Sequence, residues 1–513
     1  MLIPADTVSR RERVTLLFAV LIIAICALIY ELIVATLSSY LLGDSITQFS
    51  FTIGFFLFAM GIGSLLSRRI KRHTLRWFIV VEFAVALFGG TSALILYAVF
   101  SYADVYYYAM MICVSLAIGI CVGLEIPLLT RIVADRSDLS TALADVLSID
   151  YLGALVGSLA FPVILLPLLG VTQTAFVMAL LNISVATMVL HVFNEKLSPR
   201  WSRTLWVSAL GIAGIMLGGV LFSTDLTRIL EQRLYSANII YAEQTPYQRI
   251  VLTARNTDYR LYINGNLQFS TLDEYRYHEM LVHPAMMASR SRERVLILGG
   301  GDGFVAREVL KHDDVQSVTV VDLDPAITEL ARHFAVMERF NEDALDDPRV
   351  TIIHEDAFTY IAEGADIFNV IIMDLPDPNN ESLSKLYSDS FYRMVRLRLA
   401  PDGALVTQAT SPYFARRSFW TIDNTLQSAE LHTIPLHANV PTFGEWGFII
   451  ATPHTTPTLT VPDVPLRYLT AQTLDHAQYF DPDLAYQDTY DAINTLDHPV
   501  LPRFYEADWR IWN

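Results

Sequence analysis

The sequence predicts a chain with two kinds of structure: a multi-pass α-helical membrane bundle, then an α/β domain preceded by a small antiparallel β unit. Three observations predict this fold class. Long apolar runs fill residues 1–223. From residue 294 onward, apolar runs of strand length alternate with helical patterns. A glycine-rich turn, residues 299–303, joins the first of these strands to a helix.

Composition separates the two parts of the chain. The 513 residues are 53 % hydrophobic. Residues 1–223 carry 13 Lys or Arg and 12 Asp or Glu, whereas the remainder carries 23 and 41, a net charge of −18. An acidic soluble part excludes nucleic acid as a partner, because nucleic acid requires a basic surface. We expect a transmembrane bundle over 1–223, a small β domain with a hairpin over 224–290 and a larger α/β catalytic domain over 291–513.

The apolar runs predict about seven transmembrane helices in contact with membrane lipid. The first run begins after Arg10, Arg11 and Arg13. It continues for roughly 29 residues, longer than the apolar core of a signal peptide, so we expect a retained anchor. The predicted spans are 14–42, 46–66, 77–100, 105–133, 140–169, 171–193 and 204–222. Three glycine pairs at helix-packing spacing favour close contact between helices: Gly119/Gly123, Gly153/Gly157 and Gly214/Gly218.

The charges around the spans give an orientation. Lys and Arg cluster before the first span and in alternate loops, which places the N-terminus in the cytoplasm. Seven crossings would then leave the soluble part outside. The chemistry inferred below uses a cytosolic metabolite, so we expect a catalytic domain in the cytosol at the inner membrane. One run would then not cross, and the long run 140–169, with Asp145 and Asp150, is the candidate.

Three acidic residues, Glu31, Glu82 and Glu125, lie within the apolar runs. Carboxylates inside membranes are rare and often functional. On this interpretation the three residues would line a path for a cation, for example a polyamine. The alternative, which we favour, is hydrogen bonding between helices or a position near the interface.

The cysteines and histidines predict no metal site. Cys26, Cys113 and Cys121 all lie in apolar runs, so we expect no disulfide framework and no thiol or zinc chemistry. His278 has no second His or Cys at metal-ligand spacing.

The soluble part begins with a predicted hairpin and continues as a doubly wound, Rossmann-like domain. Asn264-Gly265-Asn266 separates two alternating runs and is a strong hairpin signal. A helix is expected over 274–287. Strands are expected at 295–298, 318–322, 350–354, 369–374 and 404–408, with helices over 305–312, 325–340 and 391–399. This alternation predicts a parallel sheet covered by helices on both faces, with ligands at the carboxyl ends of its strands.

The glycine turn contains a carboxylate, Asp302. A loop that binds phosphate would not be helped by a negatively charged side chain at this position. Strand, glycine turn and helix form a nucleotide-binding unit. Asp302 within the turn therefore indicates a cofactor that is cationic at that point. Asp322, about 20 residues past the turn, is predicted to bind ribose hydroxyls.

Three further acids follow predicted strands. Asp356 either accepts a hydrogen bond from the exocyclic amine of adenine or caps the following helix. Asp374 and Asp377 lie on the proline-stiffened loop Asp374-Leu-Pro-Asp377-Pro. In isolation this pair indicates a turn. Beside Asp302 and Asp322 it favours chemistry on an amine, one acid accepting a proton and the other holding an ammonium.

Together these motifs resemble the spermidine synthase (polyamine aminopropyltransferase) family, over about residues 235–450 and in the expected order. The first part of the chain resembles a bacterial subgroup in which a membrane bundle is fused to the synthase. The motifs are Pro246–Gln248, Asp273–Pro284, Gly299–Gly303, Val321–Asp324, Glu355–Phe358, Asp374–Pro378, Leu386–Tyr392, Ser411-Pro412, Gly444–Phe448 and, in the subgroup, Asp508-Trp509-Arg510.

The resemblance implies transfer of an aminopropyl group from decarboxylated S-adenosylmethionine, a co-substrate rather than a permanent cofactor, to putrescine, giving spermidine and methylthioadenosine. It implies a donor site lined by Gln248, His278, Gly299, Gly301, Asp302, Asp322, Asp356 and Ala357. It implies an acceptor site with Tyr277, Asp374 and Asp377, with Asp374 as the base. A homo-oligomer, dimer or tetramer, is expected as well.

Some positions depart from the family pattern. The loop after Asp374 commonly reads Ser-Thr, where this chain has Leu375-Pro376, and Phe443 replaces a Tyr that often contacts the diamine. Ala357 stands where Gly is usual. These changes leave the acceptor open. Two other functions stay as alternatives: a methyltransferase using intact S-adenosylmethionine, and a membrane polyamine transporter or sensor with a synthase-like domain.

Overall fold

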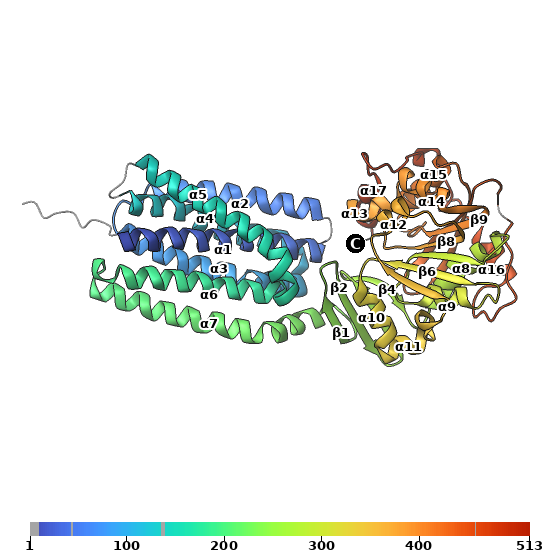
Figure 1. The fold of residues 1–513 in the computed structure, drawn as a ribbon, viewed down its shortest axis with the longest axis horizontal. Coiled ribbons are helices and arrows are strands. Elements are labelled where there is room, and N and C mark those ends of the chain that lie inside the picture. The colour runs from blue at the N-terminus through green and yellow to red at the C-terminus, as the bar shows by residue number, and fades with distance from the viewer. Residues whose placement is uncertain (1–9, 43–44, 135–138, 457, 513) are drawn as a thin grey trace, which may run out of the picture. The chain divides into compact units, whose positions relative to one another are not determined.

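The computed structural model describes residues 10–42, 45–134, 139–456 and 458–512. The chain forms two compact units, Met1–Ile239 and Ile240–Asn513 (Figure 1). The first unit is helical and the second contains both sheets apart from the start of strand β1.

Seven long helices make up the described part of the first unit. They are α1 (Arg10–Leu42), α2 (Ser45–Ser67), α3 (Thr74–Ala103), α4 (Tyr107–Val133), α5 (Leu139–Ala160), α6 (Leu166–Val192) and α7 (Pro199–Gln232). Five segments are long and apolar enough to cross a membrane, and two of them, of 60 and 53 residues, each contain two helices. The predicted spans fall on these seven helices. A π-helical turn, Phe161–Leu165, joins α5 to α6, and Gly170 (φ 68°) breaks the helical backbone inside α6.

Two of the three predicted glycine pairs pack helices together. A Cβ at Gly123 of α4 would lie 2.1 Å from the backbone oxygen of Met60 in α2. A Cβ at Gly153 of α5 would lie 2.6 Å from the oxygen of Leu21 in α1. The prediction for Gly214 and Gly218 was wrong, because no described atom outside their own helix lies within 4 Å of a Cβ at either position. Spacing alone does not say which face of α7 meets a neighbour.

Two carboxyl groups occupy the interior of the helical unit. Glu82 of α3 is fully buried and Glu125 of α4 is 2 % exposed. Both oxygens of Glu82 and one of Glu125 have no hydrogen-bond partner among the described residues. Glu31 is only partly buried. Glu82 and Glu125 therefore place two carboxyl groups in a largely apolar helical core that also buries uncharged polar side chains such as Ser115 and Asn182.

The second unit begins with a four-stranded sheet in the order β1-β2-β3-β4. Its strands are β1 (Asn238–Gln244), β2 (Arg249–Arg255), β3 (Asp258–Ile263) and β4 (Asn266–Ser270). Asn264 (φ 49°) and Gly265 (φ 80°) form the two-residue turn between β3 and β4, as the hairpin signal predicts.

A seven-stranded sheet in the order β10-β11-β9-β8-β5-β6-β7 forms the core of this unit. The five predicted strands are β5 (Arg294–Gly299), β6 (Ser317–Asp322), β7 (Val350–His354), β8 (Phe368–Asp374) and β9 (Leu399–Gln408), and they run parallel. The parallel arrangement predicted for these five strands is confirmed. Two strands that were not predicted, β10 (His432–Val440) and β11 (Gly444–Thr452), extend the sheet, and β11 runs antiparallel to both β9 and β10. Only a short turn joins β10 to β11, which leaves no room for the crossover that a parallel pair requires.

Helices cover both faces of the large sheet. Alternate β5 residues enter opposite cores: Val295 and Ile297 pack with α8 and α9, whereas Leu296 and Leu298 pack with α12, α14 and α15. The helices are α8 (Glu274–Ala288), α9 (Phe304–Leu310), α10 (Pro325–His333), α11 (Ala335–Asn341), α12 (Ala357–Glu363), α13 (Glu381–Ser384), α14 (Asp389–Arg398), α15 (Arg416–Ser428), α16 (Ala471–Ala477) and α17 (Leu501–Trp509).

The prediction of a single helix over 325–340 was wrong, because a residue with an extended backbone divides this segment into two helices. Phe334 (φ −101°, ψ 110°) separates α10 from α11. Its ring packs edge-on against Tyr241 of β1, with the ring centroids 5.9 Å apart. This contact between distant segments is invisible to a local helical pattern.

Glycine in the turn after β5 allows close contact with two other strand ends. Gly299 has φ 80°, and a Cβ there would lie 2.0 Å from the backbone oxygen of Asp374. A Cβ at Gly301 would lie 2.5 Å from Oδ2 of Asp322, which accepts a hydrogen bond from the Gly301 N–H at 3.1 Å. The turn therefore lies directly against the ends of β6 and β8.

Gly299→Ala should lower the thermal midpoint of the full-length protein in detergent more than Gly265→Ala does. Gly265 has the same φ of 80°, but no atom in the described part of the chain lies within 4 Å of an added Cβ. It therefore reports backbone strain alone, about 1–2 kcal/mol. Gly299→Ala adds a clash of about 1–3 kcal/mol. Equal midpoints for the two variants would contradict the close contact.

Candidate active site

Five carboxylates converge on the carboxyl edge of the parallel strands. Asp302 follows β5, Asp322 ends β6, Asp356 follows β7, and Asp374 ends β8 with Asp377 three residues beyond. Gly299 lies opposite Asp374 in the β5–β8 register. This is the edge at which ligands bind in open α/β sheets.

Helix α8 supplies the side chains that support this edge. Asp273, just before the helix, accepts hydrogen bonds from the backbone N–H (2.7 Å) and hydroxyl (3.0 Å) of Thr442, in the turn between β10 and β11. Glu279 is fully buried and accepts three backbone N–H groups, those of Arg467, Tyr468 and Leu469, at 2.7–2.8 Å. The acidic residues of this motif thus fix two distant loops to one helix.

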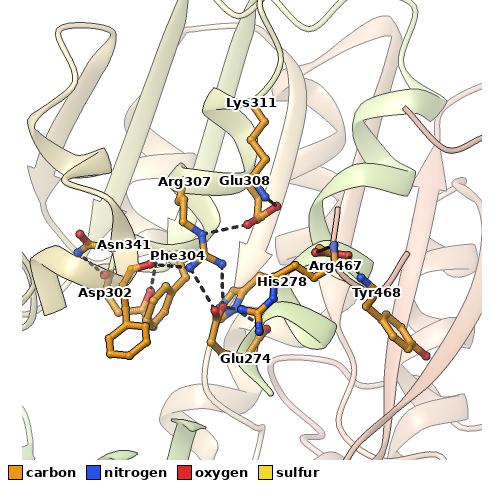
Figure 2. Close-up of polar contacts among 12 residues, drawn as sticks. Glu274, His278, Asp302, Phe304, Arg307, Glu308, Lys311, Asn341, Arg467 and Tyr468 are labelled. Atoms are coloured by element: carbon orange, nitrogen blue, oxygen red, sulfur yellow. Dashed lines mark hydrogen bonds and ion pairs between the residues drawn. The ribbon is translucent and has the colours of Figure 1, made fainter. Parts of the chain in front are cut away.

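Arg307 of α9 lies between two buried carboxylates (Figure 2). It donates to Glu274 at 2.8 and 3.1 Å and to the neighbouring Glu308 at 3.0 Å. Glu274 in turn accepts from Nδ1 of His278 at 2.9 Å. Burial alone would raise the pKa of Glu274, but His278 and Arg307 outweigh it and lower that pKa. Sequence reasoning missed Arg307, because only its spatial partners give it this role.

Glu308 anchors the far end of this network. It accepts from Nε2 of His283 at 2.8 Å and from Lys311 at 2.6 Å. Burial opposes ionisation, but His283, Arg307 and Lys311 together lower the pKa of Glu308 to about 2. The carboxylate is therefore charged at neutral pH, and it holds Arg307 in place for Glu274.

His278 places an imidazole beside the carboxylate edge. Burial works to lower its pKa, but the hydrogen bond and charge of Glu274, with Asp302 and Asp374 nearby, raise the pKa above its ordinary value. The sequence left His278 with a structural role or a donor-site role. The structure places its ring against Phe304, with the centroids 5.1 Å apart, and links it to Glu274.

Asp302 lies partly buried in the glycine turn. Its side chain accepts the N–H of Phe304 at 3.1 Å, and its backbone oxygen accepts from Asn341 at 3.0 Å (Figure 2). Burial raises the pKa of Asp302 to about 6, which the positive charge of His278 opposes and the negative charge of Asp374 reinforces. A cation bound beside Asp302 would favour its ionised form.

Asp374 pairs with Tyr277 of α8. The Tyr277 hydroxyl donates to Oδ1 of Asp374 at 2.6 Å. The Tyr277 ring packs edge-on against Phe443 and Phe448, at 6.2 and 5.2 Å between centroids. Burial raises the pKa of Asp374, while His278 and the Tyr277 hydrogen bond oppose the rise.

Asp377 accepts three side-chain hydrogen bonds. The donors are Gln408 (3.2 Å) at the end of β9, Thr410 (3.4 Å) and Tyr505 (2.8 Å) of α17. Burial raises the pKa of Asp377 to about 6, and all three donors oppose the rise. Sequence reasoning missed these donors, although Gln408 could have been noticed at the end of a predicted strand.

The remaining predicted donor residues lie around β6 and β7. Asp322 accepts backbone N–H groups from Gly301 (3.1 Å) and Asp324 (3.0 Å). Asp356 caps α12 through the N–H of Phe358 (2.9 Å) and also binds Lys385 (2.9 Å). The capping alternative for Asp356 is therefore present in the structure.

Gln248 and Ala357 complete the predicted set. Gln248 is half-buried, and its backbone N–H donates to the hydroxyl of Thr245 at 3.0 Å. That hydroxyl donates at 2.7 Å to Asp324, the cap of α10. Gln248 is thereby tied to the end of β6. Ala357 is buried at the first position of α12. Among the described residues, no group of three or more His, Cys, Asp or Glu is placed to hold a metal ion.

Comparison with known proteins identifies the family. A family model described as "Spermine/spermidine synthase domain" matches residues 274–462. The chain is 45 % identical to "Polyamine aminopropyltransferase 2" of Ralstonia nicotianae, over 97 % of this chain and 99 % of that protein. It is 42 % identical to the "Polyamine aminopropyltransferase" of Leptospira interrogans, over 96 % and 98 %. The chain belongs to the polyamine aminopropyltransferase family.

The family predicted from the ordered motifs is thus confirmed, and the similarity extends across the helical unit. Among solved structures, the chain is similar to a spermidine synthase in complex with the transition-state analogue AdoDATO. That similarity has 25 % identity and a TM-score of 0.44, and covers 47 % of this chain and 85 % of the other.

Proposed function

We propose that this polyamine aminopropyltransferase moves the aminopropyl group of decarboxylated S-adenosylmethionine to putrescine, giving spermidine and methylthioadenosine. The observation that carries the proposal is the position of Asp302, in the glycine turn, with Asp374 and Asp377 on the neighbouring strand end. This edge suits a donor and an acceptor that both carry positive charge.

Asp302 would select the donor. Decarboxylation leaves the aminopropyl arm with an ammonium and no carboxylate, and a carboxylate at Asp302 would pair with that ammonium. It would repel the carboxylate of intact S-adenosylmethionine, and the repulsion is stronger in a partly buried site than in water. Asp322 would bind the ribose hydroxyls and Asp356 the adenine amine.

The reaction would be a direct displacement at carbon. The neutral amine of putrescine attacks the methylene carbon beside the sulfonium, a C–N bond forms, the C–S bond breaks, and methylthioadenosine leaves with the electron pair. Asp374 accepts the proton that the attacking nitrogen loses, and Tyr277 holds that carboxylate in place. Asp377 binds the ammonium at the other end of the diamine.

Calorimetry should show that decarboxylated S-adenosylmethionine binds at least about tenfold more tightly than the intact form, since one like-charge contact costs more than about 1.4 kcal/mol. Asp302→Asn should reduce this preference, chiefly by weakening the decarboxylated ligand. Tighter binding of the intact form by the unmodified protein would instead support the methyltransferase alternative.

Asp374→Asn should lower turnover by roughly a hundredfold or more, the range that a general base contributes, while the dissociation constant of the donor stays within about twofold. Product formation is followed by mass spectrometry of spermidine and methylthioadenosine. Full activity in this variant would assign the base to another residue.

We also propose that the helical unit anchors the enzyme in the inner membrane with the catalytic unit in the cytosol. Five apolar helical segments long enough to span a bilayer support the anchor. The cytosolic side rests on the substrates, which are metabolites made in the cytosol. If the N-terminus is also cytosolic, as the basic loops favour, a cytosolic catalytic unit requires that the chain cross the membrane an even number of times.

A single added cysteine tests the side of the membrane. The three native cysteines all lie in the helical unit, and Leu397 on α14 of the catalytic unit is 76 % exposed. Leu397→Cys should react with a membrane-impermeant maleimide only after cells are permeabilised, with the unmodified protein as background. Labelling in intact cells would place the catalytic unit outside.

A further inference from the structure

The acceptor carboxylate Asp377 is held by a residue from the far end of the chain. Tyr505 lies 128 residues from Asp377 in sequence and donates to its Oδ2 at 2.8 Å. This is the shortest of the three side-chain hydrogen bonds that Asp377 accepts, compared with 3.2 Å from Gln408 and 3.4 Å from Thr410. A hydroxyl can donate only one hydrogen bond, and Tyr505 directs it at this carboxylate.

Helix α17, which carries Tyr505, is fixed to the catalytic unit on both sides of that residue. Leu501 is fully buried among the core residues under the sheet. Asp508 accepts from the backbone N–H (3.1 Å) and the guanidinium (2.7 Å) of Arg417. The ring of Trp509 stacks on Phe414 at 5.1 Å between centroids. The position of the Tyr505 hydroxyl is therefore set by packing.

The segment before α17 is anchored by one buried amide. Asn494 is fully buried and donates to the backbone oxygens of Ser384 (2.9 Å) and Tyr387 (3.1 Å). Its side-chain oxygen accepts the N–H of Val500 at 3.1 Å, at the start of α17. The Tyr387 hydroxyl donates to the backbone oxygen of Pro376 at 3.0 Å, beside Asp377. The C-terminal segment and the Asp377 loop thus share one network.

We propose that Tyr505 is a positioning residue that sets acceptor specificity: its hydrogen bond holds Asp377 oriented and ionised for the second ammonium of a diamine. This rests on the proposed function. A hydrogen bond donated to a carboxylate favours its charged form. The bond from Tyr505 therefore opposes the effect of burial, which raises the pKa of Asp377 to about 6.

The positions at which this chain departs from the family pattern are consistent with a role for the Tyr505 hydroxyl in the acceptor site. Phe443 lacks the hydroxyl that a Tyr would bring to the acceptor site, and Leu375-Pro376 replaces the hydroxyl-bearing Ser-Thr. The Phe443 ring packs against Trp446 at 5.0 Å and against Tyr277 at 6.2 Å, so it contributes shape only. Tyr505 brings a hydroxyl to the acceptor carboxylate from a different part of the fold.

Tyr505→Phe in the full-length enzyme tests the proposal by comparing putrescine with butylamine, which lacks the second ammonium. The KM for putrescine should rise about tenfold, as expected for losing a hydrogen bond to a charged group, with kcat within about twofold. The rate with butylamine and the dissociation constant of the donor should not change. The acid limb of kcat/KM for putrescine should move to higher pH, because Asp377 loses a donor that favours its ionised form.

Tyr486→Phe is the matched control, since Tyr486 belongs to the same C-terminal segment, is 42 % exposed and contacts Trp420 through its ring. It should behave as the unmodified enzyme. If Tyr505→Phe fails to fold, Asp508→Asn, which loosens α17 without altering Tyr505, should give the same selective loss with putrescine. Equal losses with both amines, or no loss with putrescine, would overturn the proposal. No spermidine from the unmodified enzyme would instead overturn the proposed function.

Discussion

The catalytic unit depends on how it compensates negative charge at one edge of a sheet. Asp302, Asp322, Asp374 and Asp377 are all at least partly buried there, and burial raises the pKa of each. Neighbouring like charges in a poorly solvated site oppose each other's ionisation. Each acid accepts at least one hydrogen bond, and the imidazole of His278 lies beside them. Cationic substrates would complete the compensation.

The supporting network explains why one short motif carries so many charged residues. Five residues of this motif have defined partners. Asp273 and Glu279 bind distant loops, and Glu274 binds Arg307 and His278. Tyr277 bonds to Asp374, and His278 lies near Asp302 and Asp374. Burial opposes ionisation of Glu274, but His278 and Arg307 lower its pKa, and Glu308 accepts a hydrogen bond from Arg307. A change at Glu308, away from the strand ends, would therefore act on His278 through two intermediate residues, Arg307 and Glu274.

The sequence predicts most of the sheet edge because its signals are local. Strand period, the glycine turn and acids at strand ends are all visible within a few residues, and the five parallel strands follow from them. The features that were missed depend on contacts between distant segments. Phe334 breaks a helix by packing on Tyr241, and β10 and β11 reverse direction at a short turn. A Cβ at Gly214 or Gly218 would contact no other described helix. The donors to Asp377 come from two separate parts of the chain, residues 408–410 and Tyr505, so spacing along the sequence could not assign them.

Tyr505 follows every other proposed site residue in the sequence, so it is the last of them to be synthesised. Translation proceeds from the N-terminus, and domains fold as units while they are made. The helices of the first unit, the glycine turn and the acids at the strand ends all emerge before residue 505. The carboxylate that would receive the second ammonium of a diamine gains its tyrosine only after residue 505 has been added. A nascent or prematurely terminated chain would thus carry the donor-side residues without a finished acceptor side.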